Sequence, residues 1–175
     1  MRMRRRDFNA AVVIHGRKVH TLAVYLLANR EEAEDVTQEV LVRLWRRGHD
    51  VVPEKIGAWL VRVTRNACID AIRRRKDGSQ VAIDDGTGIE LREPAPGPER
   101  LAHASQLGGR IVRALDALTE PGRSVVILRE IQGLSYQEIG EALEMPMSSV
   151  RVTLHRGRRR LREELKEVHD HVAIC

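Results

Sequence analysis

The stretch that decides the fold runs from Leu134 to Leu165 and reads LSYQEIGEALEMPMSSVRVTLHRGRRRLREEL. Ser135 and Glu138 have the S-x-x-E spacing of a capping box, which predicts that a helix begins there. Pro146 interrupts helical continuation, and Ser148 is a suitable cap for a second helix. A capped helix, a tight turn and an arginine-rich second helix are typical of a helix-turn-helix, whose second helix enters the DNA major groove.

The second helix of this stretch has two chemically different sides. Spacings of three and four residues place four apolar residues on one side: Met147, Val150, Leu154 and Leu161. The other side carries mainly polar and cationic candidates for DNA contact: Ser148, Arg151, Val152, His155, Arg156 and Arg159. The alternative is the solvated surface helix of an ordinary bundle, because runs of charge are usually solvated faces.

The composition favours a globular protein with a polyanionic partner. Hydrophobic residues make up 42% of the 175 residues, which suffices for one or two small domains, and aromatic residues are only 3%, so the core must be aliphatic. The net charge of +5 favours nucleic acid or a membrane surface as partner.

Cysteine usage and hydropathy indicate a soluble, cytoplasmic protein. The only cysteines are Cys68 and Cys175, so no disulfide framework exists and a reducing compartment is expected. No stretch approaches transmembrane length, and the N-terminal apolar run is too short for a secretory signal. There is no phosphate-binding glycine loop and no nucleophile–base pair, so the sequence does not support an enzymatic role.

The chain divides into two helical blocks and a linker, which predicts an all-α fold of two small domains. The first block, residues 8–76, contains a helix over Phe8–Leu27, a second capped by Asn29 and ended by Gly48, and a third opened by Pro53. Residues 77–104 are rich in glycine, proline and acid, and read as an extended linker with at most a short strand-like piece at 81–83.

The second block, residues 105–168, begins with a helix expected over Leu107–Leu118. Thr119 is expected to cap the next helix, with Pro121 in its first turn and Gly133 at its end. The helix-turn-helix then completes the block.

The second helix of the first block carries a mixed acidic and apolar surface. Its predicted buried stripe is Val36, Val40 and Leu44, and the opposite side carries Asp35, Gln38, Glu39 and Val42, flanked by Leu41 and Trp45. Such a surface suggests a protein-docking site. Packing of Leu41 and Trp45 on a neighbouring helix explains the pattern equally well.

The third helix is apolar on two sides, with a narrow polar strip between them. Arg62, Asn66 and Arg73 form the strip, Asp70 lies at its edge, and Arg65 projects elsewhere. Arginine binds phosphates, and arginine or asparagine can bind bases, so the strip is a candidate DNA surface. For the cluster from Arg73 to Lys76 the alternative is complementation of the helix dipole, and Trp59 suits a core position better than a stacking platform.

The tail holds three potential metal ligands, His169, His171 and Cys175. Imidazole and thiolate suit zinc or copper, but three ligands at a chain end without a fourth favour a solvated, disordered tail. No metal or other cofactor is therefore expected.

Three runs of the sequence resemble parts of bacterial sigma factors. Residues 33–45 (AEDVTQEVLVRLW) are similar to the helix that binds core RNA polymerase, and residues 58–70 (AWLVRVTRNACID) to the promoter-melting helix. Residues 114–162 resemble sigma region 4. Two such blocks joined directly, without region 3, are the arrangement of the extracytoplasmic-function (group 4) sigma factors, and this resemblance covers nearly the whole chain.

The resemblance implies a role for each candidate surface. Docking on the clamp helices of the largest polymerase subunit would involve Asp35, Gln38, Glu39, Val42 and Trp45. Recognition and melting of the −10 element would involve the 48–54 loop and Trp59, Arg62, Arg65, Asn66, Asp70 and Arg73. Reading of the duplex −35 element would involve Ser148, Ser149, Arg151, Val152, His155, Arg156 and Arg159.

The resemblance also implies partners: the polymerase flap for region 4, double- and single-stranded promoter DNA, and an anti-sigma factor that masks both blocks. The acidic linker would run through the polymerase channel, and no membrane insertion is implied. Gly157 departs from the alanine common in the family and should weaken its helix by up to about 1 kcal/mol. A stand-alone helix-turn-helix regulator is the alternative, but it leaves the docking surface and the linker unexplained.

Overall fold

The computed structural model describes residues 3–78 and 108–172, and within these ranges all regular structure is helical. The predicted all-α fold is therefore confirmed. Within the same ranges no helix combines the length and apolar character needed to cross a membrane. The strand-like piece expected at 81–83 and nearly all of the expected linker lie outside the described residues.

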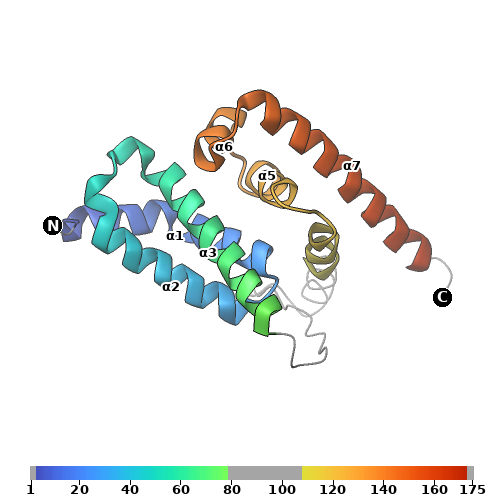
Figure 1. Ribbon diagram of the computed structural model, residues 1–175, viewed down its shortest axis with the longest axis horizontal. Coiled ribbons are helices and arrows are strands. Elements are labelled where there is room, and N and C mark those ends of the chain that lie inside the picture. Colours follow the sequence, from blue (N-terminus) through green and yellow to red (C-terminus); the bar gives the residue numbers. More distant parts are fainter. Residues whose placement is uncertain (1–2, 79–107, 173–175) are drawn as a thin grey trace, which may run out of the picture.

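The N-terminal lobe consists of three mutually packed helices (Figure 1). They are α1 (Arg5–Leu27), α2 (Arg30–Arg47) and α3 (Ile56–Gly78), with short 3-10 turns η1 (Gly48–Asp50) and η2 (Pro53–Lys55) before α3. The expected cap of α2 is confirmed, because the Asn29 side chain accepts the Glu32 backbone N–H at 3.1 Å. Pro53 opens the 3-10 turn rather than the long helix itself.

The C-terminal lobe begins with a helix at 108–116 and continues through α5 (Gly122–Val126), the π-helical turn η4 (Ile127–Ile131), α6 (Tyr136–Leu143) and α7 (Met147–Val172). The capping box is confirmed, since Ser135 and Glu138 exchange both expected hydrogen bonds.

Two other predicted caps in this lobe are wrong. Pro121, rather than Thr119, precedes α5, and no side chain caps that helix. Instead the Thr119 carbonyl accepts the Arg123 N–H at 3.1 Å. Ser148 lies inside α7, because the backbone turns helical at Met147 and the Val150 N–H already bonds the Pro146 carbonyl.

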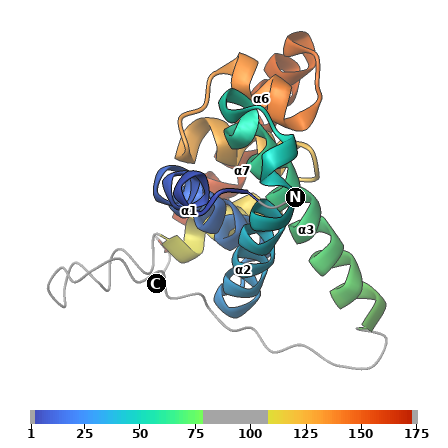
Figure 2. The ribbon, with the colours of Figure 1, turned by 90° about the vertical axis from the view of Figure 1, so that its left-hand side faces the viewer.

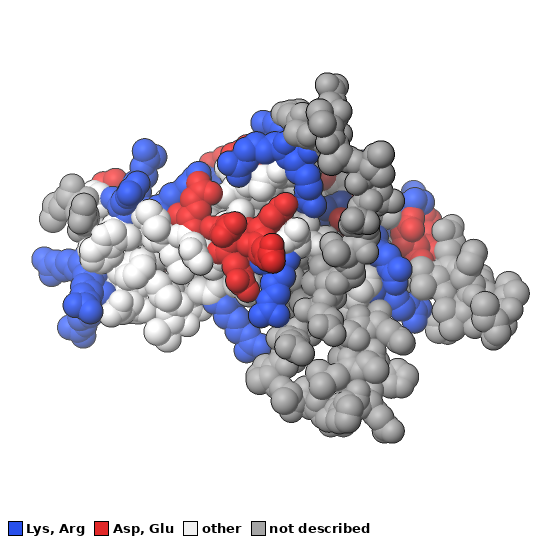
Figure 3. Space-filling model, turned by 90° about the horizontal axis from the view of Figure 1, so that it is seen from below, with Lys and Arg blue, Asp and Glu red and all other residues white. Residues whose placement is uncertain are grey.

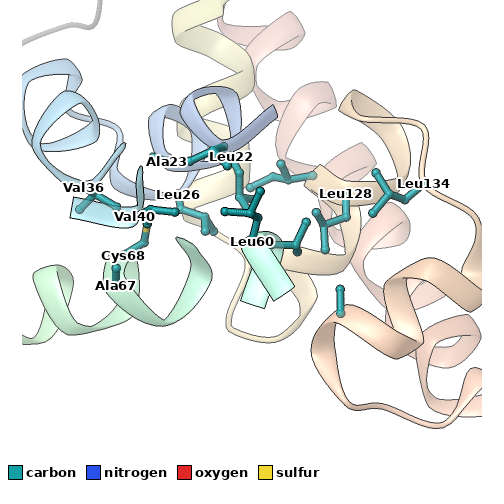
Figure 4. Close-up of a cluster of buried hydrophobic side chains, with 14 of the residues drawn as sticks. Leu22, Ala23, Leu26, Val36, Val40, Leu60, Ala67, Cys68, Leu128 and Leu134 are labelled. Atoms are coloured by element: carbon teal, nitrogen blue, oxygen red, sulfur yellow. The ribbon is translucent and has the colours of Figure 1, made fainter. Parts of the chain in front are cut away.

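The core is aliphatic and runs without a break from one lobe into the other. Figure 4 shows Leu22 of α1 and Leu60 of α3 beside Leu128 of η4, with Leu134 beyond. The first three are at most 1% exposed. Because burial of one leucine side chain stabilises a fold by about 1.5–3 kcal/mol, this shared cluster contributes to holding the lobes together.

Polar contacts reinforce the packing between the lobes. α6 lies against α3 and η4 against α1 (Figure 2). The Gln132 amide donates to the Lys18 carbonyl at 2.7 Å, and the Arg123 guanidinium donates to the Leu26 carbonyl at 3.4 Å. The two lobes thus form one closed body in which the start of α3 faces the helix-turn-helix.

Candidate nucleic-acid interface

The two sides expected of α7 are present in the structure. Val150 and Leu154 are at most 1% exposed, and Gly157, further along the same side of the helix, is buried against Val126. Seven residues form the surface that we call the α7 face, and all but the half-buried Ser149 are exposed: Ser148, Ser149, Arg151, Val152, His155, Arg156 and Arg159. One member of the expected inner side is misplaced, because Met147 is 47% exposed at the first position of the helix.

One arginine of the α7 face is held by an aromatic ring. The Arg151 guanidinium lies 5.9 Å from the centroid of Tyr136, and Arg129 lies 5.1 Å from the same centroid. Arginine over a tyrosine ring is attracted by the ring quadrupole. Tyr136, on the first helix of the motif, therefore helps to position Arg151 on the second.

Another arginine of α7 is engaged inside the lobe. Arg158 makes two hydrogen bonds to Glu130, at 2.6 and 2.9 Å, and this carboxylate raises the pKa of the Arg158 guanidinium. Arg160 pairs with Glu164 at 2.5 Å. The charge of Arg158 is therefore balanced by a carboxylate of the same lobe.

The polar strip of α3 is present but partly covered. Asn66 is exposed, and Arg73 is 70% exposed beside Asp70 at 3.9 Å. Arg62, in contrast, pairs with Glu144 at the end of α6, and Arg65 pairs with Glu120 before α5 at 3.1 Å. Arg65 does project away from the strip, as expected, and its direction is toward the other lobe.

A cavity of about 580 Å³ opens beside the start of α3. Trp59 and Arg62 line it from α3, and Lys55 lines it from η2. Glu141 of α6 and Glu144, which follows that helix, line it from the other lobe. Trp59 is half-buried and packs against the hydrophobic core, as its sequence context favours. The same side chain also lines the cavity.

The mixed surface of α2 is available to a partner. Asp35, Gln38 and Glu39 are exposed, and Val42 is 47% exposed among them. The ring of Trp45 packs edge-on against Phe8 of α1, with centroids 5.2 Å apart, so the alternative of packing on a neighbouring helix holds for this residue. Acidic side chains gather on the side of the molecule where α2 lies (Figure 3).

Among the residues whose side chains the structure describes, no group of three histidine, cysteine, aspartate or glutamate residues is placed to hold a metal ion. Cys68 is fully buried, and burial, with the Glu120 and Glu32 carboxylates as lesser causes, raises the pKa of its thiol to about 12. The tail candidates His169, His171 and Cys175 lie beyond the described side chains.

Each of the two lobes matches a known protein family. A model of Sigma-70 region 2 matches residues 12–77, and a model of Sigma-70 region 4 matches residues 108–161. The ECF RNA polymerase sigma factor SigW of Bacillus subtilis is 32% identical over 168 residues, which cover 92% of this chain and 90% of SigW. The chain belongs to the ECF family of RNA polymerase sigma factors.

Other relatives agree with the family and with the fold. The ECF sigma factor SigE of Mycolicibacterium smegmatis is 39% identical over 86% of this chain, although the match spans only 58% of SigE. The sigma factor RpoE of Bartonella quintana, solved in complex with the anti-sigma factor NepR, superposes with a TM-score of 0.73 at 22% identity over 91% of this chain and 97% of its own. CnrH, solved with the cytosolic domain of CnrY, gives 0.67 at 23% identity over 94% and 90%. These two likenesses show the fold.

The predictions from the sequence missed the acidic residues that meet α3 from the other lobe. Glu141 and Glu144 lie one turn apart at the end of α6, and Glu120 lies before α5. Predicting these acidic neighbours of α3 would have required knowing that the helix-turn-helix packs against α3.

Proposed function

We propose that this ECF sigma factor binds core RNA polymerase and directs it to specific promoters, with α7 on the −35 element and α3 on the −10 element. The observation that carries the proposal is the α7 face, an exposed row of arginine, histidine and serine on a helix whose other side is buried in the lobe. The expected division into region 2 at 8–76 and region 4 at 105–168 is part of this proposal.

On the −35 element, α7 would lie in the major groove. Arg151, Arg156 and Arg159 can bind the O6 and N7 acceptors of guanine in a bidentate manner, and each good pair contributes about 1–3 kcal/mol of discrimination. Val152, which is 50% exposed, offers an apolar contact to a thymine methyl group. His155 and the serines add hydrogen bonds to bases or phosphates.

On the −10 element, α3 and the preceding loop would hold an opened strand. Extruding a base from the duplex costs a few kcal/mol, which the protein must offset. Stacking on an aromatic ring such as Trp59 contributes about 1–3 kcal/mol per base, and Arg62, Arg65, Asn66 and Arg73 supply charge and hydrogen bonds for the backbone. The 580 Å³ cavity beside Trp59 supports this role because it offers room for a base.

The α2 surface would dock on the polymerase. This surface places acidic and polar side chains around one apolar residue, which complements the basic clamp helices of the largest subunit. Its members are Asp35, Gln38, Glu39 and Val42. Trp45, packed on Phe8, would support this surface from behind. Region 4 would contact the flap.

We further propose an anti-sigma partner and a cytoplasmic, non-catalytic role. Two structural neighbours were solved in complex with NepR and with the cytosolic domain of CnrY. Sigma factors act on transcription initiation without chemistry of their own, which supports the non-catalytic role.

The test is transcription in vitro with purified chain, bacterial core polymerase and genomic fragments, followed by sequencing of the start sites. We expect discrete starts that are lost with Asp35→Ala or Gln38→Ala and kept with Glu31→Ala, which changes an exposed acid in the first turn of the same helix. Specific DNA binding without starts and without co-elution with core would instead support the stand-alone regulator.

A further inference from the structure

Arg151 is held differently from the arginines of α7 that form ion pairs. Arg158, on the same helix, donates two hydrogen bonds to the Glu130 carboxylate, at 2.6 and 2.9 Å. The Arg151 guanidinium instead lies over the ring of Tyr136, 5.9 Å from its centroid, and its Nη2 donates to the Met147 sulfur at 3.8 Å. We call Tyr136 and Met147 together the Arg151 cradle.

The cradle orients the guanidinium without satisfying its hydrogen-bond donors. A guanidinium offers a fork of N–H donors, and a carboxylate occupies two of them when the pair is bidentate. The face of an aromatic ring attracts the cation through its quadrupole, and a thioether is only a weak acceptor. Arg151, which is exposed, therefore keeps its fork available for the O6 and N7 acceptors of a guanine.

The cradle also explains the exposure of Met147. Periodicity predicts this residue on the inner side of α7, yet it is 47% exposed. It lies one helical turn before Arg151, and residues four apart on a helix are neighbours, so its flexible thioether reaches the guanidinium. This apolar side chain thus has a contact on the DNA-facing side of the helix rather than in the core.

The ring of Tyr136 is itself fixed in place. Tyr136 is the first residue of α6, directly after the capping residue Ser135, and it packs against the hydrophobic core. The N–H of the preceding Leu134 donates to the Leu128 carbonyl at 3.0 Å, and the Leu134 carbonyl accepts from Arg129 at 2.7 Å. The Arg129 guanidinium also lies 5.1 Å from the ring centroid. The ring is therefore a fixed support on α6, which packs against α7 (Figure 1).

We propose that the Arg151 cradle determines base specificity in the −35 element, by aiming the Arg151 fork at one base pair before DNA binds. This inference rests on the proposed function of α7 and adds two positioning residues to it, Tyr136 and Met147, which act through Arg151. A long side chain loses rotamer freedom when it is fixed against a base, and a support that fixes it in advance removes part of that entropic cost.

The cradle should affect specificity more than affinity. A misaligned fork cannot form a bidentate pair with a base, yet its charge still attracts phosphates. Loss of the cradle should therefore weaken discrimination at the base pair read by Arg151 and leave the discrimination at other base pairs unchanged.

The test uses holoenzyme assembled from the full chain and bacterial core polymerase. Transcription is measured from promoters that carry every single base-pair substitution in the −35 element, and the base pair read by Arg151 is the one at which Arg151→Ala loses discrimination. Tyr136→Leu, which keeps apolar bulk but removes the ring, should reduce discrimination at that base pair about threefold. Tyr136→Phe, which keeps the ring, should retain it.

A double-mutant cycle separates positioning from a general effect on folding or binding. In the Arg151→Ala background, Tyr136→Leu should cause no further loss of discrimination, because the two residues act as one unit. The matched control is Arg156→Ala on the same face, in which the effects of the two substitutions should add. Uniform loss at all base pairs, or an equal effect of Tyr136→Leu with and without Arg151, overturns the proposal.

A second measurement needs neither DNA nor polymerase. Nitrogen-15 relaxation of the Arg151 Nε–H group reports how far the guanidinium moves on the picosecond to nanosecond timescale. Tyr136→Leu and Met147→Ala should each increase this motion, and Tyr136→Phe should leave it unchanged. If Tyr136→Leu leaves the motion as it is, the cradle is overturned. Failure of the proposed function would look different, because the unaltered chain would then give no discrete starts whatever the motion of Arg151.

Discussion

Alanine at Gly157 tests the close approach of α7 to α5. A Cβ at this position would lie 2.6 Å from Cγ2 of Val126, whereas carbon atoms pack at about 3.5–4.0 Å, so one helix must give way by roughly 1 Å. Val126 is 1% exposed and cannot swing into solvent. Overpacking of this kind costs about 1–3 kcal/mol, and alanine regains about 1 kcal/mol of helix propensity, so we expect a net loss of about 1 kcal/mol.

The matched control is Gly16→Ala in α1. There the new Cβ would lie 3.6 Å from Val12 Cγ1, which is an ordinary contact. The higher helix propensity of alanine should therefore raise the free energy of unfolding by about 0.5–1 kcal/mol. Urea unfolding followed by circular dichroism should give a lower midpoint for Gly157→Ala and a higher one for Gly16→Ala at unchanged slope. The reasoning is refuted if both variants raise the midpoint equally.

Three further predictions concern caps, thiols and DNA. Ser135→Ala should lower the free energy of unfolding by about 1 kcal/mol. Hydrogen bonds with Ser135 lower the pKa of Glu138, so the stability contributed by this carboxylate should be complete above the ordinary carboxyl pKa and lost as pH falls through the lowered pKa. Urea unfolding at a series of pH values measures both effects. Cys68, with its thiol pKa raised to about 12, should react with a thiol reagent at neutral pH only after unfolding, once the terminal cysteine is replaced by serine. Arg156→Ala should weaken binding to one −35 sequence selectively, whereas Arg162→Ala should weaken all sequences evenly and reduce the salt dependence; equal effects of both in anisotropy titrations would contradict the assignment of the α7 face.

Sequence patterns over a few neighbouring residues predicted two helix caps and the buried side of α7. The caps at Asn29 and Ser135 were found because a side chain and a backbone N–H three residues later satisfy each other without help from the rest of the chain. The buried side of α7 followed from periodicity, except at Met147, where the helix has only just begun.

The failures have two physical causes: local backbone hydrogen bonds start two helices at neighbouring residues, and long-range contacts are invisible to local patterns. Thr119 and Ser148 are good caps by composition, yet α5 follows Pro121 and α7 begins at Met147. The partners of Arg62 and Arg65 lie 82 and 55 residues away along the chain, beyond the range of any periodicity argument. Gly157 similarly looks like a weak point of its helix until Val126 is placed against it.

The covalent connection between the two lobes changes what a weak contact can achieve. Segments tethered in one chain meet at effective concentrations on the order of millimolar, so an association too weak to survive between separate molecules can be largely formed within one. The contacts of Arg62 and Arg65 are of this modest kind. Dilution therefore leaves the closed form intact, whereas cutting the chain between the lobes would release region 2. A partner that separates the lobes must therefore compete with this high local concentration rather than with one tight contact.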